Sequence, residues 1–305
     1  MPHLRTALAG AALLAAAVVI SIRVLGPLRA TGGPSVDNRA MSDFRDVVYD
    51  PVVAFLDGEN PYDRATFARK YPGTFGIGLY SPLILLLHLP LGFLPIWTAA
   101  IVYYCVALAL TMALAPLALR LCGAEATAAR TLGLAAILVS SRPGHWNLYT
   151  GQVTLPVTIG AYLALGYART RPGLAGLGLA LATFKPTYGG PLAGLLLARG
   201  DRRAIAVGFA VAAVLTGAAI TLLATRVGFG PLLASVLATY HEHATDPSKS
   251  AAVAPFRVDV VALVGRMLGS APGYGTSIAL TSGKIAVRRM TRPKRRSVFP
   301  STATA

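Results

Sequence analysis

Long apolar segments constrain the fold of this chain more than any other feature of its sequence. Residues 6–28, 96–119 and 205–225 each supply the roughly 20 apolar residues that a helix needs to cross a bilayer. Only 13% of the 305 residues are charged, against about 25% in soluble domains. The sequence therefore predicts an all-α, polytopic integral membrane protein with about seven or eight transmembrane helices. An ordinary soluble enzyme and a disordered chain are excluded.

Four further apolar segments are short, and they lie at residues 131–141, 153–168, 174–184 and 186–198. At about 1.5 Å of rise per residue, several of them cannot cross a bilayer alone. Short helices broken by Pro or Gly are tolerated in a membrane only where protein or a cavity covers their backbone. These segments therefore predict a cavity within the bilayer region.

Two short basic loops, at residues 169–171 and 199–203, orient the chain because Lys and Arg concentrate in cytoplasmic loops. Counting helices from these loops places residues 29–75 outside the cytoplasm, provided that residues 82–94 form an interfacial or re-entrant helix. The same count places residues 145–152 in an outer loop. We therefore expect a multi-pass protein of the plasma membrane whose functional face is extracytoplasmic.

The chain divides into five segments. They are the first transmembrane helix (1–28), an extracytoplasmic loop with interfacial helices (29–95), a multi-helix membrane domain (96–240), an outer loop with an amphipathic helix (241–269) and a basic tail expected to be disordered (270–305). The tail holds 7 of the 28 Lys and Arg residues. The formal charge of +16 therefore reflects orientation and this tail, and it does not indicate a nucleic-acid partner. The Ala-, Gly- and Arg-rich composition is typical of a high-GC bacterium.

Acidic residues are scarce and unevenly placed. Seven of the twelve lie between residues 37 and 63. Among them, Asp43 and Asp46 follow the first helix closely and accompany an apolar pattern typical of an interfacial helix. A carboxylate held at a membrane surface beside an apolar groove is a candidate general base. A Ser-Asp pair is also a good helix N-cap, so spacing alone leaves both roles open for Asp43.

Several motifs, taken in order, resemble one enzyme family. They are Asp43-Phe44, Leu56-Asp57-Gly58, Asn60-Pro61-Tyr62-Asp63, Tyr80-Ser81-Pro82-Leu83, Pro90-Leu91, Leu94-Pro95, Gly151-Gln152 and Phe184-Lys185-Pro186-Thr187. The chain resembles the glycosyltransferases of family 87, polytopic enzymes of the GT-C type, over roughly residues 35–265. The resemblance implies transfer of a sugar, with mannose expected, from a polyprenyl-phosphate donor. The acceptor would be a hydroxyl of a glycolipid or polysaccharide on the outer face.

The resemblance also implies a role for one aspartate of the first outer loop, which in such enzymes takes the acceptor's proton. Asp43 matches that position. The family often has a tyrosine about four residues later, whereas Tyr49 follows Asp43 by six residues and Asp46 by three. Asp46 therefore competes with Asp43 for the role of base.

Displacing a phosphate from an anomeric carbon also requires positive charge near the leaving group. Lys185, Arg45 and Arg142 are cations at predicted outer helix ends, and they are candidates for binding the donor phosphate. Lys185 lies between two short helices, where an ionisable residue is a functional hypothesis by default. The alternative for Lys185 is snorkelling to the outer interface.

Three polar residues are candidates for binding the sugar or the acceptor. Gln152 and Asn147 have amide side chains suited to sugar hydroxyls, with turn formation as the alternative role. Tyr80 lies at a predicted interface, where aromatic belts also collect.

The sequence predicts no cofactor and no metal. His241-Glu242-His243 lacks both the H-E-x-x-H spacing and a third ligand. The expected partners are the lipid-linked donor, the acceptor and membrane lipid. Because no apolar run long enough to span follows residue 269, the C-terminal part is expected to be truncated or altered relative to the family. The alternatives are therefore an inactive homologue, or a non-catalytic transport or lipid-handling protein.

Overall fold

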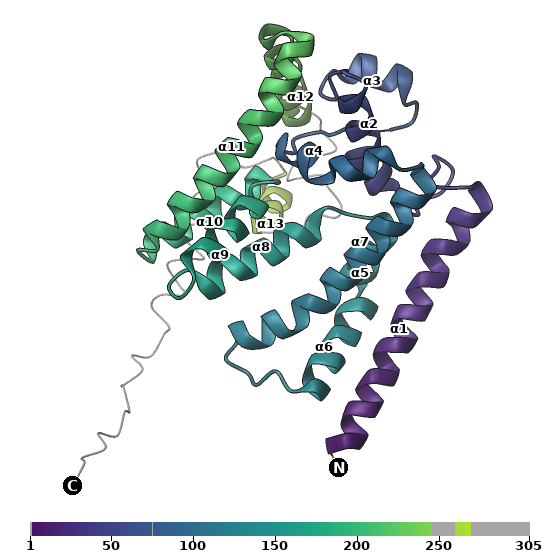
Figure 1. Cartoon of the computed structure of the whole chain (residues 1–305), viewed down its shortest axis with the longest axis vertical. Helices are drawn as coiled ribbons and strands as arrows, with labels where there is room; N and C mark the ends of the chain where they lie inside the picture. Colours follow the sequence, from purple (N-terminus) through teal and green to yellow (C-terminus); the bar gives the residue numbers. More distant parts are fainter. Residues whose placement is uncertain (1, 75, 246–259, 270–305) are drawn as a thin grey trace. The chain divides into compact units, whose positions relative to one another are not determined.

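A computed structural model describes residues 2–74, 76–245 and 260–269, and every regular element in these residues is helical (Figure 1). In chain order the elements are α1 (Pro2–Thr31), η1 (Phe44–Tyr49), α2 (Asp50–Leu56), α3 (Arg64–Lys70), α4 (Leu83–His88), η2 (Leu89–Phe93), α5 (Ile96–Leu121), α6 (Ala128–Ser140), α7 (Arg142–Thr150), α8 (Thr154–Tyr167), α9 (Pro172–Ala182), α10 (Pro186–Ala198), α11 (Arg202–Val227), α12 (Phe229–Thr245) and α13 (Val260–Leu268). η1 is a π-helix and η2 is a 3₁₀-helix. The predicted all-α class is confirmed.

The chain forms two units, Met1–Tyr240 and His241–Ala305. The described helix that lies wholly in the second unit, α13, occupies most of the segment predicted to be amphipathic, residues 257–268. Residues 257–259 and the basic tail, 270–305, lie outside the described residues. The candidate site belongs entirely to the first unit.

Three helices are long and apolar enough to cross a membrane, namely His3–Thr31, Ile96–Leu121 and Arg202–Val227. They include the three long segments predicted from the sequence. Four shorter apolar helices accompany them, at Leu83–Phe93, Ala128–Ser140, Thr154–Tyr167 and Pro172–Ala182. The protein is an all-α membrane protein, and the number of crossings stays a prediction.

Helices of the first unit approach one another through small residues. α8 lies against α9, where a Cβ atom added to Gly160 would collide with the carbonyl oxygen of Gly178, and the reverse also holds. α9 in turn lies against α11, where a Cβ at Gly208 would meet Leu179 at 2.8 Å. Small residues let helix backbones come close where the bilayer supplies no hydrophobic drive for association.

The segment between α1 and α5 folds into short helices. The segment predicted to be an interfacial helix forms η1 and α2. Its apolar residues Phe44, Val48, Val52 and Phe55 are buried in the core. α4 and η2 cover residues 82–94, where the sequence predicts an interfacial or re-entrant helix. The apolar residues of the first segment therefore pack on protein together with the buried Arg45, Asp46 and Asp50, and an interfacial position of this segment stays a prediction.

The sequence predicts an outer loop at residues 145–152, but most of this segment is helical and belongs to α7. α7 begins after Ser141, whose hydroxyl accepts a hydrogen bond from the Gly144 amide at 3.2 Å. Pro143 lies in the first turn, where the missing amide hydrogen costs nothing. The helix ends at Gly151, which has a φ of 71°. Pro-Gly signals a turn in a sequence, but Pro just after a serine cap also starts helices.

Candidate active site

The start of η1 is docked on the end of α7. The Met41 amide donates a hydrogen bond of 2.7 Å to the Tyr149 carbonyl oxygen. At the adjoining Gly151, an added Cβ atom would lie 2.7 Å from the Cβ of Phe44 and 3.1 Å from the Sδ of Met41. Only glycine satisfies both this close approach and the positive φ. Two segments about a hundred residues apart in the chain are thereby brought into contact.

Asp43 lies at this junction and is half-buried. Its Oδ2 accepts a hydrogen bond of 3.1 Å from the Thr150 hydroxyl. Asp43 directly precedes η1, yet its side chain makes no capping hydrogen bond. The N-cap role left open by the sequence is therefore wrong, because the carboxylate is directed to α7 instead of to its own helix.

The charge of Asp43 depends on four influences. Burial raises the pKa of its carboxyl group above the ordinary value of 3.8. Hydrogen bonding from the side chains of Thr150 and Gln152 and the positive charge of Lys185 lower that pKa and only partly offset the effect of burial. Asp43, Gln152 and Lys185 are thus brought together by the fold.

Lys185 enters the site from the junction of α9 and α10. Its Nζ lies over the ring of Tyr80, 5.3 Å from the centroid, and 5.9 Å from that of Tyr188. The Ser81 amide donates a hydrogen bond of 3.0 Å to the Phe184 carbonyl oxygen, so the residues next to Tyr80 and Lys185 are linked through their backbones. Burial raises the pKa of Tyr80 to about 12, and the charge of Asp43 adds to this rise.

Gln152 is one of three residues with polar groups, beside His88 and Tyr103, that line an apolar groove. Its Oε1 accepts a hydrogen bond of 3.2 Å from the Thr154 hydroxyl, and its carbonyl oxygen accepts one of 3.3 Å from Tyr103. The groove has a volume of about 370 Å³ and runs between α4, α5 and α8. Its lining includes Leu87, Leu91, Val102, Val106, Leu155 and Ile159. A largely apolar cavity with few polar groups is typical of small-molecule sites.

Asp46 and Arg45 form a separate buried pair. The Arg45 Nε donates to the Asp46 Oδ1 at 2.7 Å, and their side chains are only 8% and 3% exposed. Burial raises the pKa of the neighbouring Asp50 to about 7, against the lowering effect of Arg45. The ion pair with Arg45 thus occupies the Asp46 carboxylate.

Arg142 and Asn147 also lie apart from Asp43. Arg142 is exposed at the start of α7, eight residues and thus about 12 Å from Thr150 along the helix. The Asn147 Nδ2 donates to the Pro143 carbonyl oxygen at 2.7 Å, one turn earlier in the same helix. Within the described residues, neither side chain forms a hydrogen bond or an ion pair with Asp43.

Two residues of the site are absent from the candidates found in the sequence. Thr150 donates to Asp43, and Tyr188 contributes an aromatic face to Lys185. Thr150 lies within the segment interpreted as a loop, beside the Gly151-Gln152 motif. Tyr188 follows Lys185 by three residues, which is about one turn of a helix. This spacing could have predicted that the two side chains are neighbours.

This set of side chains has the elements of proton transfer and anion binding. It offers a carboxylate with a raised pKa, an ammonium group and a side-chain amide that lines an apolar groove. Among residues 2–74, 76–245 and 260–269, no three His, Cys, Asp or Glu side chains are grouped so that they could hold a metal ion. A carboxylate of this kind can accept a proton, and an ammonium group can bind an anion.

The fold and site thus define an all-α membrane protein with a cluster of polar side chains, one of which, Gln152, lines an apolar groove. The chain belongs to glycosyltransferase family 87, whose model matches residues 79–304. No curated protein and no solved structure shows a significant match to the chain. The match includes Tyr80, Gln152 and Lys185 but begins after Asp43. The family match also includes the basic tail, whereas the motifs indicate a resemblance only as far as about residue 265.

Proposed function

We propose that the protein transfers a sugar, with mannose expected, from a polyprenyl-phosphate donor to a hydroxyl of a glycolipid or polysaccharide. The reaction takes place at the extracytoplasmic face of the plasma membrane and inverts the anomeric configuration. The observation that carries this proposal is the meeting of Asp43 and Lys185 with Gln152, a residue that also lines an apolar groove. Membership of a glycosyltransferase family supplies the reaction class.

In the proposed reaction Asp43 is the general base. Its carboxylate takes the proton of the acceptor hydroxyl while the hydroxyl oxygen forms a bond to the anomeric carbon. The bond between that carbon and the phosphate oxygen breaks, and the polyprenyl phosphate leaves with the electron pair. A single displacement of this kind inverts the anomeric centre, through an oxocarbenium-like transition state.

Lys185 is the proposed partner of the departing phosphate. It lies close enough to Asp43 to lower the pKa of that carboxyl group, so its ammonium is near the reacting atoms. The faces of Tyr80 and Tyr188 hold the ammonium by cation–π interaction. Gln152 is proposed to bind a sugar hydroxyl, and the apolar groove to hold the first isoprene units of the donor.

We favour Asp43 over Asp46 as the base because of their surroundings. Asp46 is buried and paired with Arg45, whereas Asp43 is half-buried and therefore more accessible. A base must reach a proton on the incoming substrate. The same pairing argues against Arg45 as a ligand of the phosphate, and the exposed position of Arg142 argues against that residue.

The test is sugar transfer in membranes that contain the full chain, with polyprenyl-phosphate mannose and polyprenyl-phosphate arabinose as donors. Asp43→Asn should lower the rate by about 10²- to 10⁴-fold, the usual contribution of a general base. Asp37→Asn, which changes an exposed acid of the same segment, should leave the rate unchanged. Asp46→Asn should lower the yield of folded protein while the rate per folded molecule is kept.

Two results would contradict the proposal in different ways. Full activity of Asp43→Asn would remove Asp43 as the base while leaving the transferase function intact. Absence of transfer from every donor, with donor binding retained, would favour a lipid-handling protein or an inactive homologue. The groove would still account for lipid binding in that case.

A further inference from the structure

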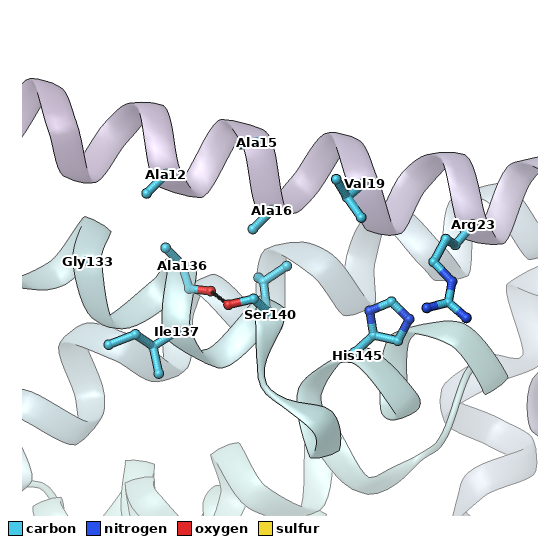
Figure 2. Close-up of a pocket in the computed structure, with 11 residues that line it drawn as sticks. Ala12, Ala15, Ala16, Val19, Arg23, Gly133, Ala136, Ile137, Ser140 and His145 are labelled. Carbon is cyan, nitrogen blue, oxygen red and sulfur yellow. Dashed lines mark hydrogen bonds between the residues drawn. The ribbon is translucent and has the colours of Figure 1, made fainter.

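A second cavity lies between α1, α6 and α7, outside the site described above. It has a volume of about 620 Å³, within the roughly 300–1,000 Å³ of small-molecule sites. Small residues form one stretch of its wall, from α1 (Ala12, Ala15, Ala16) and α6 (Gly133, Ala136), as Figure 2 shows. α1 is long, apolar and mostly unburied by the rest of the protein. In a bilayer, this cavity therefore borders on lipid chains.

One end of the cavity is basic. Arg23 from α1 and His145 from α7 point toward one another there (Figure 2). The guanidinium of Arg23 also lies 5.9 Å from the centroid of the Tyr149 ring. Among the described residues that line the cavity, none is acidic.

In the part of the chain that the structure describes, His145 has a ring nitrogen without a partner, and Arg23 is exposed, so that both side chains can reach a ligand. The Nε2 atom of His145 is buried and has no hydrogen-bond partner there. Arg23 lies eight residues, or about 12 Å, before the end of α1. A charged side chain at such a depth is normally paired or marks a functional site. Burial and the charge of Arg23 lower the pKa of His145 below its ordinary value of 6.5, and a bound anion would relieve the second effect.

We propose that this cavity binds an anionic glycerophospholipid of the surrounding bilayer. An acyl chain lies along the alanine- and glycine-lined wall between α1 and α6, and the headgroup phosphate accepts hydrogen bonds from Arg23 and His145. Both the shape and the charge of the cavity favour this ligand. Its apolar wall between α1 and α6, called the trough below, fits an acyl chain, and Arg23 and His145 can donate to a phosphate without a competing carboxylate in the lining. The bound lipid stabilises the packing of α1 on α6 and α7, and it does not react.

The test uses the full chain in detergent, with phosphatidylglycerol and phosphatidylcholine of identical acyl chains. Native mass spectrometry measures the dissociation constant of each lipid. Phosphatidylglycerol should bind the wild type about tenfold more tightly than phosphatidylcholine, as one charge-assisted interaction allows. Arg23→Gln should remove that preference, and Arg23→Lys should restore part of it. Ala16→Phe, which fills the trough, should weaken the binding of both lipids.

Arg29→Gln is the matched control, because it removes the same charge from the exposed end of the same helix. The proposal is overturned if Arg23→Gln and Arg29→Gln lower phosphatidylglycerol affinity equally, since the effect would then be general electrostatics. Equal affinity of the wild type for the two phospholipids also overturns it, as does binding of a glycolipid acceptor alone. If Ala16→Phe does not fold, Ala136→Phe tests the same trough from α6, and unchanged lipid binding there contradicts the proposed location.

Discussion

Asp43 is a carboxyl group whose neighbours have opposing effects on its charge. Burial favours the neutral form, and Thr150, Gln152 and Lys185 favour the ionised one. A general base works best when its pKa approaches the working pH, because it is then both ionised and able to hold a proton. At the residue scale, this balance distinguishes Asp43 from an exposed carboxylate of the same loop.

The pH dependence of transfer should report this balance. Asp43 acts in its ionised form, so kcat/KM should fall as the pH drops through a pKa above 3.8. Lys185→Met removes a charge that lowers this pKa, so the acidic limb should move to higher pH, by about 1 unit or less. Measuring kcat/KM between pH 4 and 9 checks the shift, with Arg120→Met as a control at an exposed helix end. An unmoved limb in Lys185→Met would mean that Lys185 does not act on the base.

Asp50 should make stability depend on pH. Its folded pKa is raised from 3.8 to about 7 by burial, so the folded state binds a proton more tightly than the unfolded state. Folding stability is therefore lost as the pH rises from about 4 to 7. Asp50→Asn should stabilise the protein by an amount that grows over this range and levels off above pH 7, at no more than about 4 kcal/mol.

Thermal unfolding in detergent at pH 5 and pH 8 measures the effect of Asp50→Asn. The gain in Tm should be larger at pH 8 than at pH 5, while Asp37→Asn, at an exposed position, should show no such trend. An equal gain at both pH values would indicate that ionisation of Asp50 is not the cause.

At the scale of elements, the site depends on how α7 ends against the start of η1. Gly151 has a left-handed backbone and no room for a side chain on the side that faces Phe44. The residues on either side of it are Thr150, which donates a hydrogen bond to Asp43, and Gln152, whose side chain helps to lower the pKa of Asp43. The geometry of the carboxylate is thus set by one helix terminus.

Gly151→Ala should therefore impair both stability and transfer. Gly123 provides a matched control, because it has a φ of 72° with no atom within 4 Å of an added Cβ. Gly123→Ala should cost only the left-handed strain of about 1 kcal/mol, with activity kept. Gly151→Ala should lower Tm further and reduce transfer by about tenfold or more, as displaced catalytic geometry does. Equal behaviour of the two variants in unfolding and transfer assays would contradict the role of the contact.

At the scale of the whole molecule, the expected topology separates the acidic segment from the loop that follows α5. A cysteine at Asn60 should react with a membrane-impermeant maleimide in intact cells, in a chain in which Cys105→Ala removes one native thiol. Native Cys122, exposed just after α5, should react only after permeabilisation, since residues 120–130 are expected to be cytoplasmic. Mass spectrometry of the labelled peptides distinguishes the two thiols. Labelling of Cys122 in intact cells would reverse the orientation.

Much of the fold follows from local properties of the sequence. The long helices α1, α5 and α11 match apolar segments that are visible by length alone, because a bilayer requires about 20 apolar residues per crossing. α7 was not foreseen as a helix, because counting helices from the basic loops placed residues 145–152 in an outer loop. For a short segment, the hydrogen bonds at its two ends decide between turn and helix.

The sequence by itself determined the helical membrane class and the concentration of acids before residue 64, because hydropathy and composition are local. It also identified Asp43, Gln152 and Lys185 as candidates, through motifs that lie far apart in the chain. Only the tertiary structure decided that these three meet and that Asp46 turns to Arg45 instead. Asp43 and Asp46 are three residues apart and would share a face of an α-helix, but Asp43 precedes the π-helix η1 and Asp46 lies inside it. Proximity between distant residues depends on helix packing, here on the glycine contacts of α7, α8 and α9, which no local pattern specifies.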